Sequence, residues 1–403
     1  MKISGRYLLI LIGMCGLLAT GVGLCTNVAG LFFTPIAEDF GVLRGSVSMT
    51  LTICNLVFAA GGMFTPRLVH ENNFRFLLIL GTAMIAGATM AMSLAQGMAL
   101  LYVLNAIRGF AAGVLGFVFV TTIINRWFID YNGLATSIAM CTSGLAGAVF
   151  SPVISSLIQN SGWRFAYVAV GILMVLFNLP AILFLPCLSP RSKGLSPLGT
   201  PKEAEVSHAG EAKSASVINK GILALAILFA VFSAGSTALP QFFPGLADSY
   251  ALPAAVGASM LSFCMIANTA GKLILGVIID KIGCRLATIF YLALALIALV
   301  LFLMIHQSGA LLAGAVLFGT VYALGTVSLA IMTRELFGAE NYSRTYPTVS
   351  LAGTVANALL STVVGFMYDF TGGYTAILIM FVIMLAAAVF IVLRAYAGRQ
   401  ASV

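Results

Sequence analysis

The chain has 403 residues, of which 61% are hydrophobic and 8% are charged, and its mean hydropathy is +1.08. Because soluble domains carry about 25% charged residues, this composition excludes a soluble fold and indicates a membrane protein built from apolar helices. The net charge of +8 comes from cations dispersed among short loops, without a basic arm or stripe, so no nucleic-acid partner is expected.

Apolar windows of spanning length recur along the chain and predict an all-α membrane protein with twelve transmembrane helices. The first window follows Lys2 and Arg6 as in a signal peptide, but its apolar run is too long, so we expect it to stay in place as a helix. The windows lie at about 7–33, 46–66, 75–95, 99–124, 133–157, 163–186, 220–243, 253–279, 286–306, 309–333, 345–368 and 374–396.

The Lys and Arg residues other than Arg108 and Lys272 are unequally divided between the two sides of the membrane. Only Arg44 and Arg164 fall on the side opposite the N-terminus, and all the others fall on the N-terminal side. The positive-inside rule makes that side cytoplasmic. We therefore expect a multi-pass protein of the plasma (inner) membrane, embedded in the lipid bilayer, with both termini in the cytoplasm.

A polar segment divides the windows into two groups of six. Residues 187–219 are rich in Ser, Pro, Lys and Glu and poor in aromatic residues, which is typical of a flexible linker. The predicted domains are an N-terminal six-helix bundle over 1–186, a cytoplasmic linker over 187–219 and a C-terminal six-helix bundle over 220–403.

The two groups carry similar landmarks at similar spacing. "GGMFTPRLVHENNFRF" follows the second window and "GVIIDKIGCRLA" the eighth, while "SGWRFAY" precedes the sixth window and "TGGYTAI" the twelfth. These landmarks keep the same membrane side, so the repeat is parallel, with the halves related by a pseudo-two-fold axis. In transporters with such repeats the substrate site lies at the repeat interface, near the midplane of the bilayer.

One cation lies inside an apolar window of each half. Arg108 is in "ALLYVLNAIRGFAAGVLGFVFVTTI" and Lys272 is in "AAVGASMLSFCMIANTAGKLILGVII", and neither stretch contains Asp or Glu. A charge at this depth costs about 2.5–3.5 kcal/mol on insertion scales, which makes each cation a candidate binding residue for an anion. Asn105 and Asn268, three and four residues before these cations, share their helix faces and are further candidates.

The loop after the eighth window resembles the cytoplasmic latch loop of the major facilitator superfamily. The pattern G-x-x-x-D-[RK]-x-G-x-[RK] is matched by Gly276, Asp280, Lys281, Gly283 and Arg285. We expect Gly276 to allow close helix approach, Asp280 to meet helix N-termini or cations, and Gly283 to permit a tight turn. The N-terminal copy keeps Gly62 and Arg67 but has Pro66 where the family has Asp.

The stretch from Asn125 to Arg164 resembles the oxalate/formate antiporter and monocarboxylate transporter branches of this superfamily. The resemblance is carried by "NRWF", "GLA", a Gly-rich helix with Pro152, and "GWR". In these branches a substrate-binding Arg stands eight residues before the latch Asp, which is the position of Lys272. The resemblance implies that Lys272 binds a carboxylate, by a point charge rather than by a planar fork.

Each cation has a structural alternative. Lys272 could extend its side chain toward the cytoplasm, and Arg108 could clamp backbone carbonyls. Asn27 and Tyr346 are further substrate-binding candidates, although a polar side chain in a span is more often an interhelical contact.

These features predict a secondary transporter for a small organic anion, first of all a monocarboxylate, working by alternating access. The spans carry no Asp, Glu or His placed to hold a proton, so both proton symport and anion exchange remain open. The alternatives are an exporter of amphipathic drugs or metabolites and, more distantly, a non-transporting sensor. An enzyme is not expected, and neither a metal nor another cofactor, because the three His and seven Cys show no metal-ligand spacing.

Overall fold

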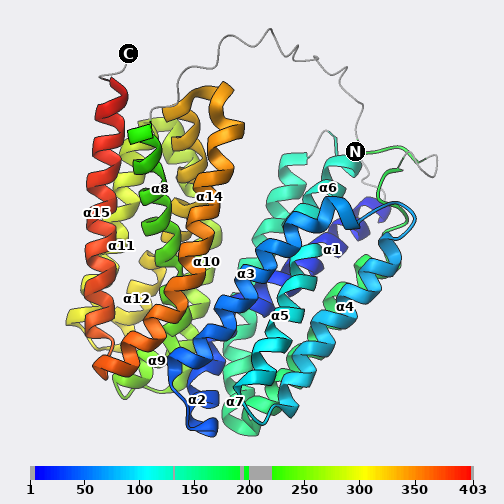
Figure 1. The fold of residues 1–403 in the computed structure, drawn as a ribbon, viewed down its shortest axis with the longest axis horizontal. Helices are drawn as coiled ribbons and strands as arrows, with labels where there is room; N and C mark the ends of the chain where they lie inside the picture. The colour runs from blue at the N-terminus through cyan, green and yellow to red at the C-terminus, as the bar shows by residue number, and fades with distance from the viewer. Residues whose placement is uncertain (1–4, 130–131, 191–194, 199–219, 401–403) are drawn as a thin grey trace. The chain divides into compact units, whose positions relative to one another are not determined.

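The computed structural model describes residues 5–129, 132–190, 195–198 and 220–400 (Figure 1). Within these ranges the chain is helical throughout its regular structure, and the only β pairing is an isolated bridge between Phe128 and Leu198. The predicted all-α membrane fold is confirmed. The expected linker lies largely outside the described residues, and only 187–190 and 195–198 of it belong to them.

The chain divides into two compact units. Unit 1 comprises Met1–Val42 and Met49–Gly210, and unit 2 comprises Leu43–Ser48 and Glu211–Val403. The first turn of the third helix therefore groups with unit 2, whereas the rest of that helix belongs to unit 1.

Unit 1 contains α-helices interrupted by short π- and 3₁₀-helical segments. A π-helix, η1, continues α1 in the middle of the first predicted span. The elements in chain order are α1 (Gly5–Leu18), η1 (Ala19–Asn27), η2 (Ala29–Phe32), α2 (Phe33–Phe40), α3 (Arg44–Leu68), α4 (Phe74–Ala91), η3 (Met92–Leu94), α5 (Met98–Val114), α6 (Phe117–Trp127) and α7 (Asn132–Phe184).

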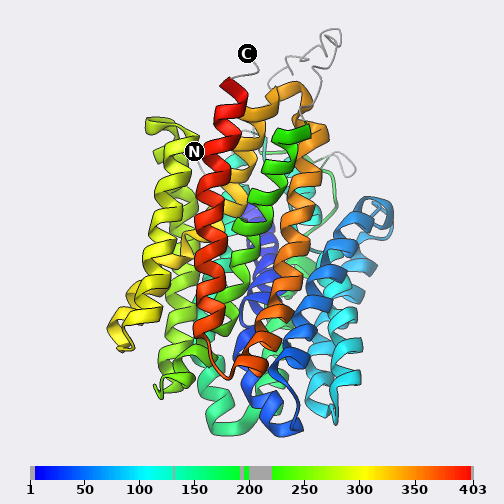
Figure 2. The ribbon, with the colours of Figure 1, turned by 60° about the vertical axis from the view of Figure 1, so that its left-hand side comes forward.

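Unit 2 is built in a similar way. Helix α8 lies beside both α14 and α15 in two views of the ribbon (Figures 1 and 2). The elements in chain order are α8 (Lys220–Gly235), η5 (Ser236–Phe242), α9 (Phe243–Ser249), α10 (Ala254–Ile282), α11 (Cys284–Met304), α12 (Ser308–Gly319), α13 (Val321–Ala323), η6 (Leu324–Ser328), α14 (Leu329–Thr371) and α15 (Thr375–Gln400).

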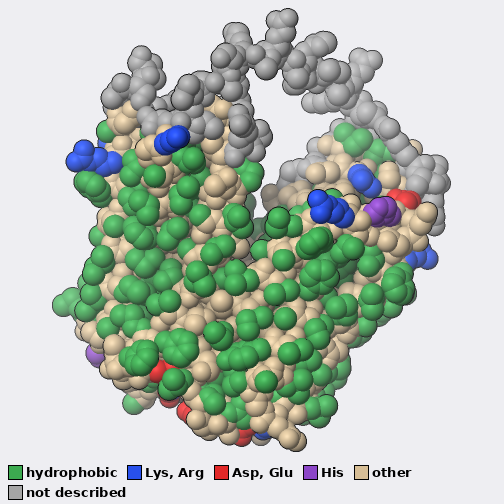
Figure 3. Space-filling model, viewed as in Figure 1, with side chains coloured by type: hydrophobic (Ala, Val, Ile, Leu, Met, Phe, Trp, Pro, Cys, Tyr) green, Lys and Arg blue, Asp and Glu red, His purple; other side chains and the backbone are tan. Residues whose placement is uncertain are grey.

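The long apolar helices account for the predicted spans. Eleven helical segments of the described chain are long and apolar enough to cross a membrane. One of them, Leu134–Phe184, has twice the usual length and is broken at Gly162, whose φ is +80°. Counting its two parts separately gives the twelve predicted spans. Figure 3 shows hydrophobic side chains along the flanks of the helices, as expected for surfaces facing lipid.

The turns between helices repeat at an interval of 210 residues. Gly41 and Ala251 both adopt a left-handed conformation, with φ of +62° and +56°; Gly41 directly follows α2, and Ala251 is the second residue after α9. Gly162 and Gly372 have φ of +80° and +70° at turns near the same ends of the units, where Arg164 contacts Asp39 and Asp369 contacts Arg44. The two halves therefore share backbone geometry as well as sequence landmarks.

Helix packing repeats at the same interval. A Cβ added to Gly109 would lie 2.5 Å from the carbonyl oxygen of Cys54, so α5 packs against the backbone of α3. A Cβ added to Gly319 would lie 2.5 Å from the carbonyl oxygen of Cys264, so α12 packs on α10 in the same manner. Gly109 adjoins Arg108, and Gly319 packs beside Asn268, so these glycine contacts fix the helices that carry the candidate site residues.

Candidate functional site

Arg108 is buried in the interior of unit 1. Its side chain is 4% exposed, and its Nη2 donates a hydrogen bond of 2.6 Å to Oδ1 of Asn105. Its Nε has no hydrogen-bond partner in the part of the chain that the structure describes. Neither ion pair found among the described residues involves Arg108, which therefore has an unused donor and no carboxylate to balance its charge.

The polar side chains around Arg108 are two thiols, a phenol and an amide. Cys25 of η1, Cys54 of α3 and Tyr167 of α7 lie within electrostatic range of the guanidinium. The amide of Asn105 donates to the backbone oxygen of Leu101 at 2.8 Å, which turns its carbonyl oxygen toward Arg108. This arrangement orients the arginine, as the i, i+3 spacing predicted.

Asn27 is also buried in unit 1. Its Nδ2 donates to the backbone oxygen of Ser143 at 3.0 Å, so it joins η1 to α7. This contact is of the interhelical kind.

Lys272 and Asn268 lie on α10 in unit 2. Lys272 is half-buried, whereas Asn268 is 5% exposed and its Oδ1 has no partner among the described residues. The neighbouring Gly271 accepts a hydrogen bond of 2.9 Å from the hydroxyl of Tyr291 through its backbone oxygen. The side-chain oxygen of Asn268 is thus a buried hydrogen-bond acceptor four residues from Lys272, and no described residue donates to it.

The two cations do not occupy equivalent positions of the repeat. At the 210-residue interval, Arg108 corresponds to Phe318, and Lys272 corresponds to Gly62. Arg108 lies on the fourth span of its half, but Lys272 lies on the second span of its half. The expectation of one cation in each half holds, while the two halves use different helices to carry it.

The latch loop of unit 2 has the predicted turn but few contacts. Gly283 adopts φ +82° and separates α10 from α11, as its place in the pattern requires. The close approach expected at Gly276 is not found, since a Cβ there would meet no atom of the described chain within 4 Å. Asp280 and Lys281 are exposed, and Arg285 keeps an Nε without a partner among the described residues.

The corresponding loop of unit 1 differs from this pattern. Arg67 is exposed in the last turn of α3, after Pro66. In place of a left-handed glycine, Asn73 closes the turn, since its Oδ1 accepts from the amide of His70 and its Nδ2 donates to the carbonyl of Leu68, both at 2.8 Å.

Tyr346 lies in unit 2 and makes an aromatic contact. Its ring stacks on that of Tyr342, with centroids 5.0 Å apart.

A polar group of unit 2 was missed by sequence reasoning. It includes Asn357 of α14, whose Nδ2 donates to Oγ1 of Thr237 at 2.7 Å. Tyr322 donates to the backbone oxygen of Thr237 at 3.4 Å and completes this neutral group.

An acidic residue was also missed. Glu335 follows the predicted tenth span but lies within the apolar helical segment that continues to Gly338, and it is half-buried. Its Oε2 accepts a hydrogen bond of 2.6 Å from the hydroxyl of Tyr396. Glu335 is thus an acid near the end of an apolar helical segment, and the apolar windows did not identify it because the helix runs further than its window suggests.

Arg164 of the "GWR" motif forms a charged cluster in unit 1. It donates to Asp39 at 2.8 Å and to the backbone oxygen of Ala95 at 3.3 Å, and its guanidinium lies over the Trp163 ring at 4.3 Å. These contacts give the three residues of the motif a structural role at the turn before the sixth span.

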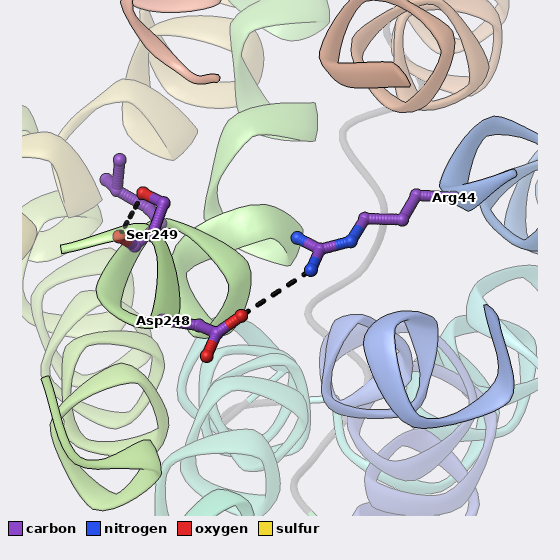
Figure 4. A network of polar contacts seen from close by, with 4 residues as sticks. Arg44, Asp248 and Ser249 are labelled. Atoms are coloured by element: carbon purple, nitrogen blue, oxygen red, sulfur yellow. Dashed lines mark hydrogen bonds and ion pairs between the residues drawn. The ribbon is translucent and has the colours of Figure 1, made fainter. Parts of the chain in front are cut away.

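Arg44 forms the comparable cluster in unit 2 (Figure 4). Its Nη2 lies 3.5 Å from Asp248, and its guanidinium lies 4.3 Å from the centroid of Tyr368. The carboxylate of Asp369 accepts the backbone amides of Arg44 and Gly45 at 3.0 and 2.7 Å, so it caps the first turn of α3. Both arginines expected opposite the N-terminal side therefore have acidic partners, unlike Arg108.

Curated relatives of this chain are membrane transporters. The uncharacterized MFS-type transporter YcxA of Bacillus subtilis is 25% identical over 95% of this chain and 93% of its own length. The oxalate:formate antiporter of Oxalobacter formigenes is 28% identical over 36% of this chain and 34% of its own, and human monocarboxylate transporter 7 is 24% identical over 36% and 28%.

Solved structures share the fold. The nucleoside transporter NupG matches with a TM-score of 0.72 at 12% identity, covering 96% of this chain and all of its own. The D-xylose-proton symporter matches with a TM-score of 0.71 at 14% identity, covering 95% and 96%.

The family model described as Major Facilitator Superfamily matches residues 15–308 and 225–402. Together these segments span nearly the whole chain, including both units and the latch loop. The protein is therefore a transporter that belongs to the Major Facilitator Superfamily.

Proposed function

We propose that this transporter carries a small organic anion, first of all a monocarboxylate, by alternating access. The observation that carries the proposal is Arg108, a fully charged group buried in unit 1 with an unused Nε donor and no acidic partner among the described residues. Burying a charge without compensation is unfavourable, so a ligand that supplies negative charge would stabilise this arrangement. A carboxylate offers two acceptor oxygens that match the planar donors of a guanidinium.

Lys272 supports the same substrate class from unit 2. It keeps a cation at the position where the resembling branches have a substrate-binding Arg, and Asn268 beside it has an unused buried oxygen. That oxygen is an acceptor, which would suit a hydroxyl or a protonated group of the substrate better than a second carboxylate. The likeness to an oxalate:formate antiporter and to a monocarboxylate transporter agrees with a carboxylate.

The proposal also covers the ion that is coupled to transport and the orientation of the protein in the membrane. Anion exchange needs no protein-bound proton, whereas proton symport could use Glu335, the half-buried acid held by Tyr396. The distribution of Lys and Arg favours the plasma membrane with both termini in the cytoplasm.

A panel of solutes in proteoliposomes tests the proposal. Uptake and exchange of mono- and dicarboxylates, nucleosides, amino acids and cationic dyes are compared for the wild type, Arg108→Ala and Lys272→Ala. Arg75→Ala is the matched control, because it removes an exposed cation of unit 1 from the first turn of α4. We expect carboxylate flux that Arg108→Ala abolishes and Arg75→Ala preserves. Carboxylate flux that survives in both Arg108→Ala and Lys272→Ala would refute the assignment.

Export of an amphipathic drug or metabolite is the second candidate. A purine ribonucleoside efflux pump of Salmonella is 24% identical to this chain over 157 residues, which are 38% of the chain. The neutral group of Thr237, Tyr322 and Asn357 offers hydrogen-bonding atoms of the kind that an uncharged polar solute needs. Nucleoside or dye flux without carboxylate flux in the same panel would favour this candidate.

A further inference from the structure

The helix that carries Arg108 is broken on one side of it. Helix α5 ends at Val114, and α6 begins at Phe117 after Gly116, whose φ and ψ of −82° and −143° are not helical. A Cβ on Gly116 would lie 2.7 Å from the carbonyl oxygen of Ala112, so glycine is required at this break. Helix α6 is therefore a separate short segment joined to α5 by a hinge.

The far end of α6 is held by the start of the segment expected to be a flexible linker. The indole of Trp127 donates to the backbone oxygen of Cys187 at 3.2 Å. Leu198 donates its amide to the carbonyl of Trp127 at 2.8 Å and accepts from the amide of Ile129 at 2.9 Å. The described linker residues thus differ from the flexible chain expected of them, because they complete the backbone hydrogen bonds at the end of α6.

This strap, defined as Cys187–Pro190 and Leu195–Leu198, is also attached elsewhere in unit 1. The hydroxyl of Tyr7 on α1 donates to the backbone oxygen of Ser196 at 2.8 Å. Oε1 of Glu71, in the loop after α3, accepts the amide of Leu188 at 3.0 Å. Cys187 and Leu188 are 1% and 4% exposed, so the first part of the strap is packed into the unit, whereas Leu195–Leu198 is half-buried to exposed and is held by its hydrogen bonds.

Glu71 is the charged member of these contacts. In the latch loop of unit 2 the acid is Asp280, and the 210-residue interval places His70, rather than the Pro66 expected from the sequence pattern, at the corresponding position of unit 1. Unit 1 therefore has its acid one residue further on, and that acid contacts the strap. A charged acceptor makes this hydrogen bond stronger than a neutral pair would be.

We propose that α6 is a hinged segment whose far end is held by the strap, and that Glu71 is the positioning residue that fastens the strap to unit 1. The strap connects the loop after α3, the start of α1 and the end of α6. Its release would free α6 to turn about Gly116 relative to the Arg108 helix. The proposal concerns movement within unit 1 and holds for any transported solute.

Hydrogen–deuterium exchange of the full chain in lipid nanodiscs tests whether Glu71 and the strap hold α6, and it needs no substrate. Glu71→Ala is expected to raise exchange about 10-fold or more in peptides covering the strap, Phe128–Ile129 and α6, because a hydrogen bond to a charged group is lost. Glu71→Gln keeps an acceptor oxygen and should restore most of the protection. His70→Ala is the matched control and should leave exchange as in the wild type.

Two results would overturn the proposal. One is Glu71→Ala exchange within twofold of wild type at the strap and α6. The other is an equal rise over α4 and α5, which would indicate general destabilisation. Transport of the solute moved in the panel supplies a second readout, in which Glu71→Ala should lower Vmax several-fold with KM unchanged and Glu71→Gln should restore it. Hydrogen–deuterium exchange is measured without a transported solute. A result that refutes the role of the strap is therefore distinguishable from one that refutes the anion assignment.

Discussion

The cation of unit 1 and the cation of unit 2 stand in similar scaffolds but in different chemical settings. Arg108 is fully buried, oriented by Asn105 and lacks an acid, whereas Lys272 is half-buried beside an unused acceptor. The glycine contacts that fix their helices, at Gly109 and Gly319, are repeated at the 210-residue interval, but the charges are not. The repeat thus conserves packing between its halves and leaves side-chain chemistry free to differ.

Reciprocal substitution tests this difference most strongly. Arg108→Lys keeps the charge but loses the planar fork, so carboxylate transport should fall about 10- to 100-fold, equivalent to one charged hydrogen bond. Lys272→Arg, in contrast, should retain transport or lower KM. The measurement is initial uptake rate against substrate concentration in proteoliposomes with equal amounts of reconstituted protein. Equal losses in both variants would mean that the two cations have the same role.

The shared packing is tested at the two glycines. Gly109→Ala and Gly319→Ala each place a Cβ 2.5 Å from a backbone oxygen, so each should destabilise its unit by about 1–3 kcal/mol. Gly276→Ala is the control, because open space surrounds its Cβ. Thermal unfolding of the purified protein should show a lower Tm for the first two variants only. A Gly276→Ala loss of similar size would show that the helix glycines are sensitive for another reason.

Glu335 sharpens the comparison because it is a half-buried acid of unit 2 that accepts a hydrogen bond from Tyr396. Glu335→Gln should remove acceleration of uptake by an inward proton gradient, if protons are coupled, and leave exchange of internal for external anion intact. Uptake driven by a pH jump is compared with exchange at equal pH, with Tyr396→Phe as the companion variant. Unchanged proton-driven uptake in Glu335→Gln would remove this residue from proton transfer.

The smallest expected effect concerns the turns at Gly41 and Ala251. Both positions are left-handed, so Gly41→Ala should destabilise the protein and Ala251→Gly should stabilise it, each by about 1 kcal/mol or less after the entropy of glycine is included. Opposite shifts in Tm would show that the two turns are equivalent. Shifts of the same sign would show that surrounding contacts outweigh the backbone term.

Some of the site could be inferred from the residues alone. An arginine in an apolar window has few structural explanations, so Arg108 was found, and the i, i+3 spacing also identified Asn105 as its neighbour. Gly283 was predicted because only a tight turn accounts for its place in the loop. Glu335 was missed since hydropathy locates the apolar part of a helix and not its end.

Other features depend on residues that are distant in the sequence. Trp127 and Phe128 were noted only as a family signature, but their role comes from contacts with the segment near residues 187–198. The composition of that segment is polar, which is typical of a flexible linker. Its described residues nevertheless form backbone hydrogen bonds with Trp127 and Ile129 at the end of α6, and with Glu71 and Tyr7. Composition reports the affinity of side chains for water and carries no information on backbone partners.

The sequence by itself determined that this protein is a helical membrane transporter with two related halves, because the requirement to satisfy backbone groups in lipid leaves helices as the solution for long apolar runs. The tertiary structure decided that Arg108 has no acidic partner among the described residues while Arg44 and Arg164 have one, and that Glu71 contacts the start of the linker. These are pairings between residues far apart in the chain, and they exist only once the helices have packed.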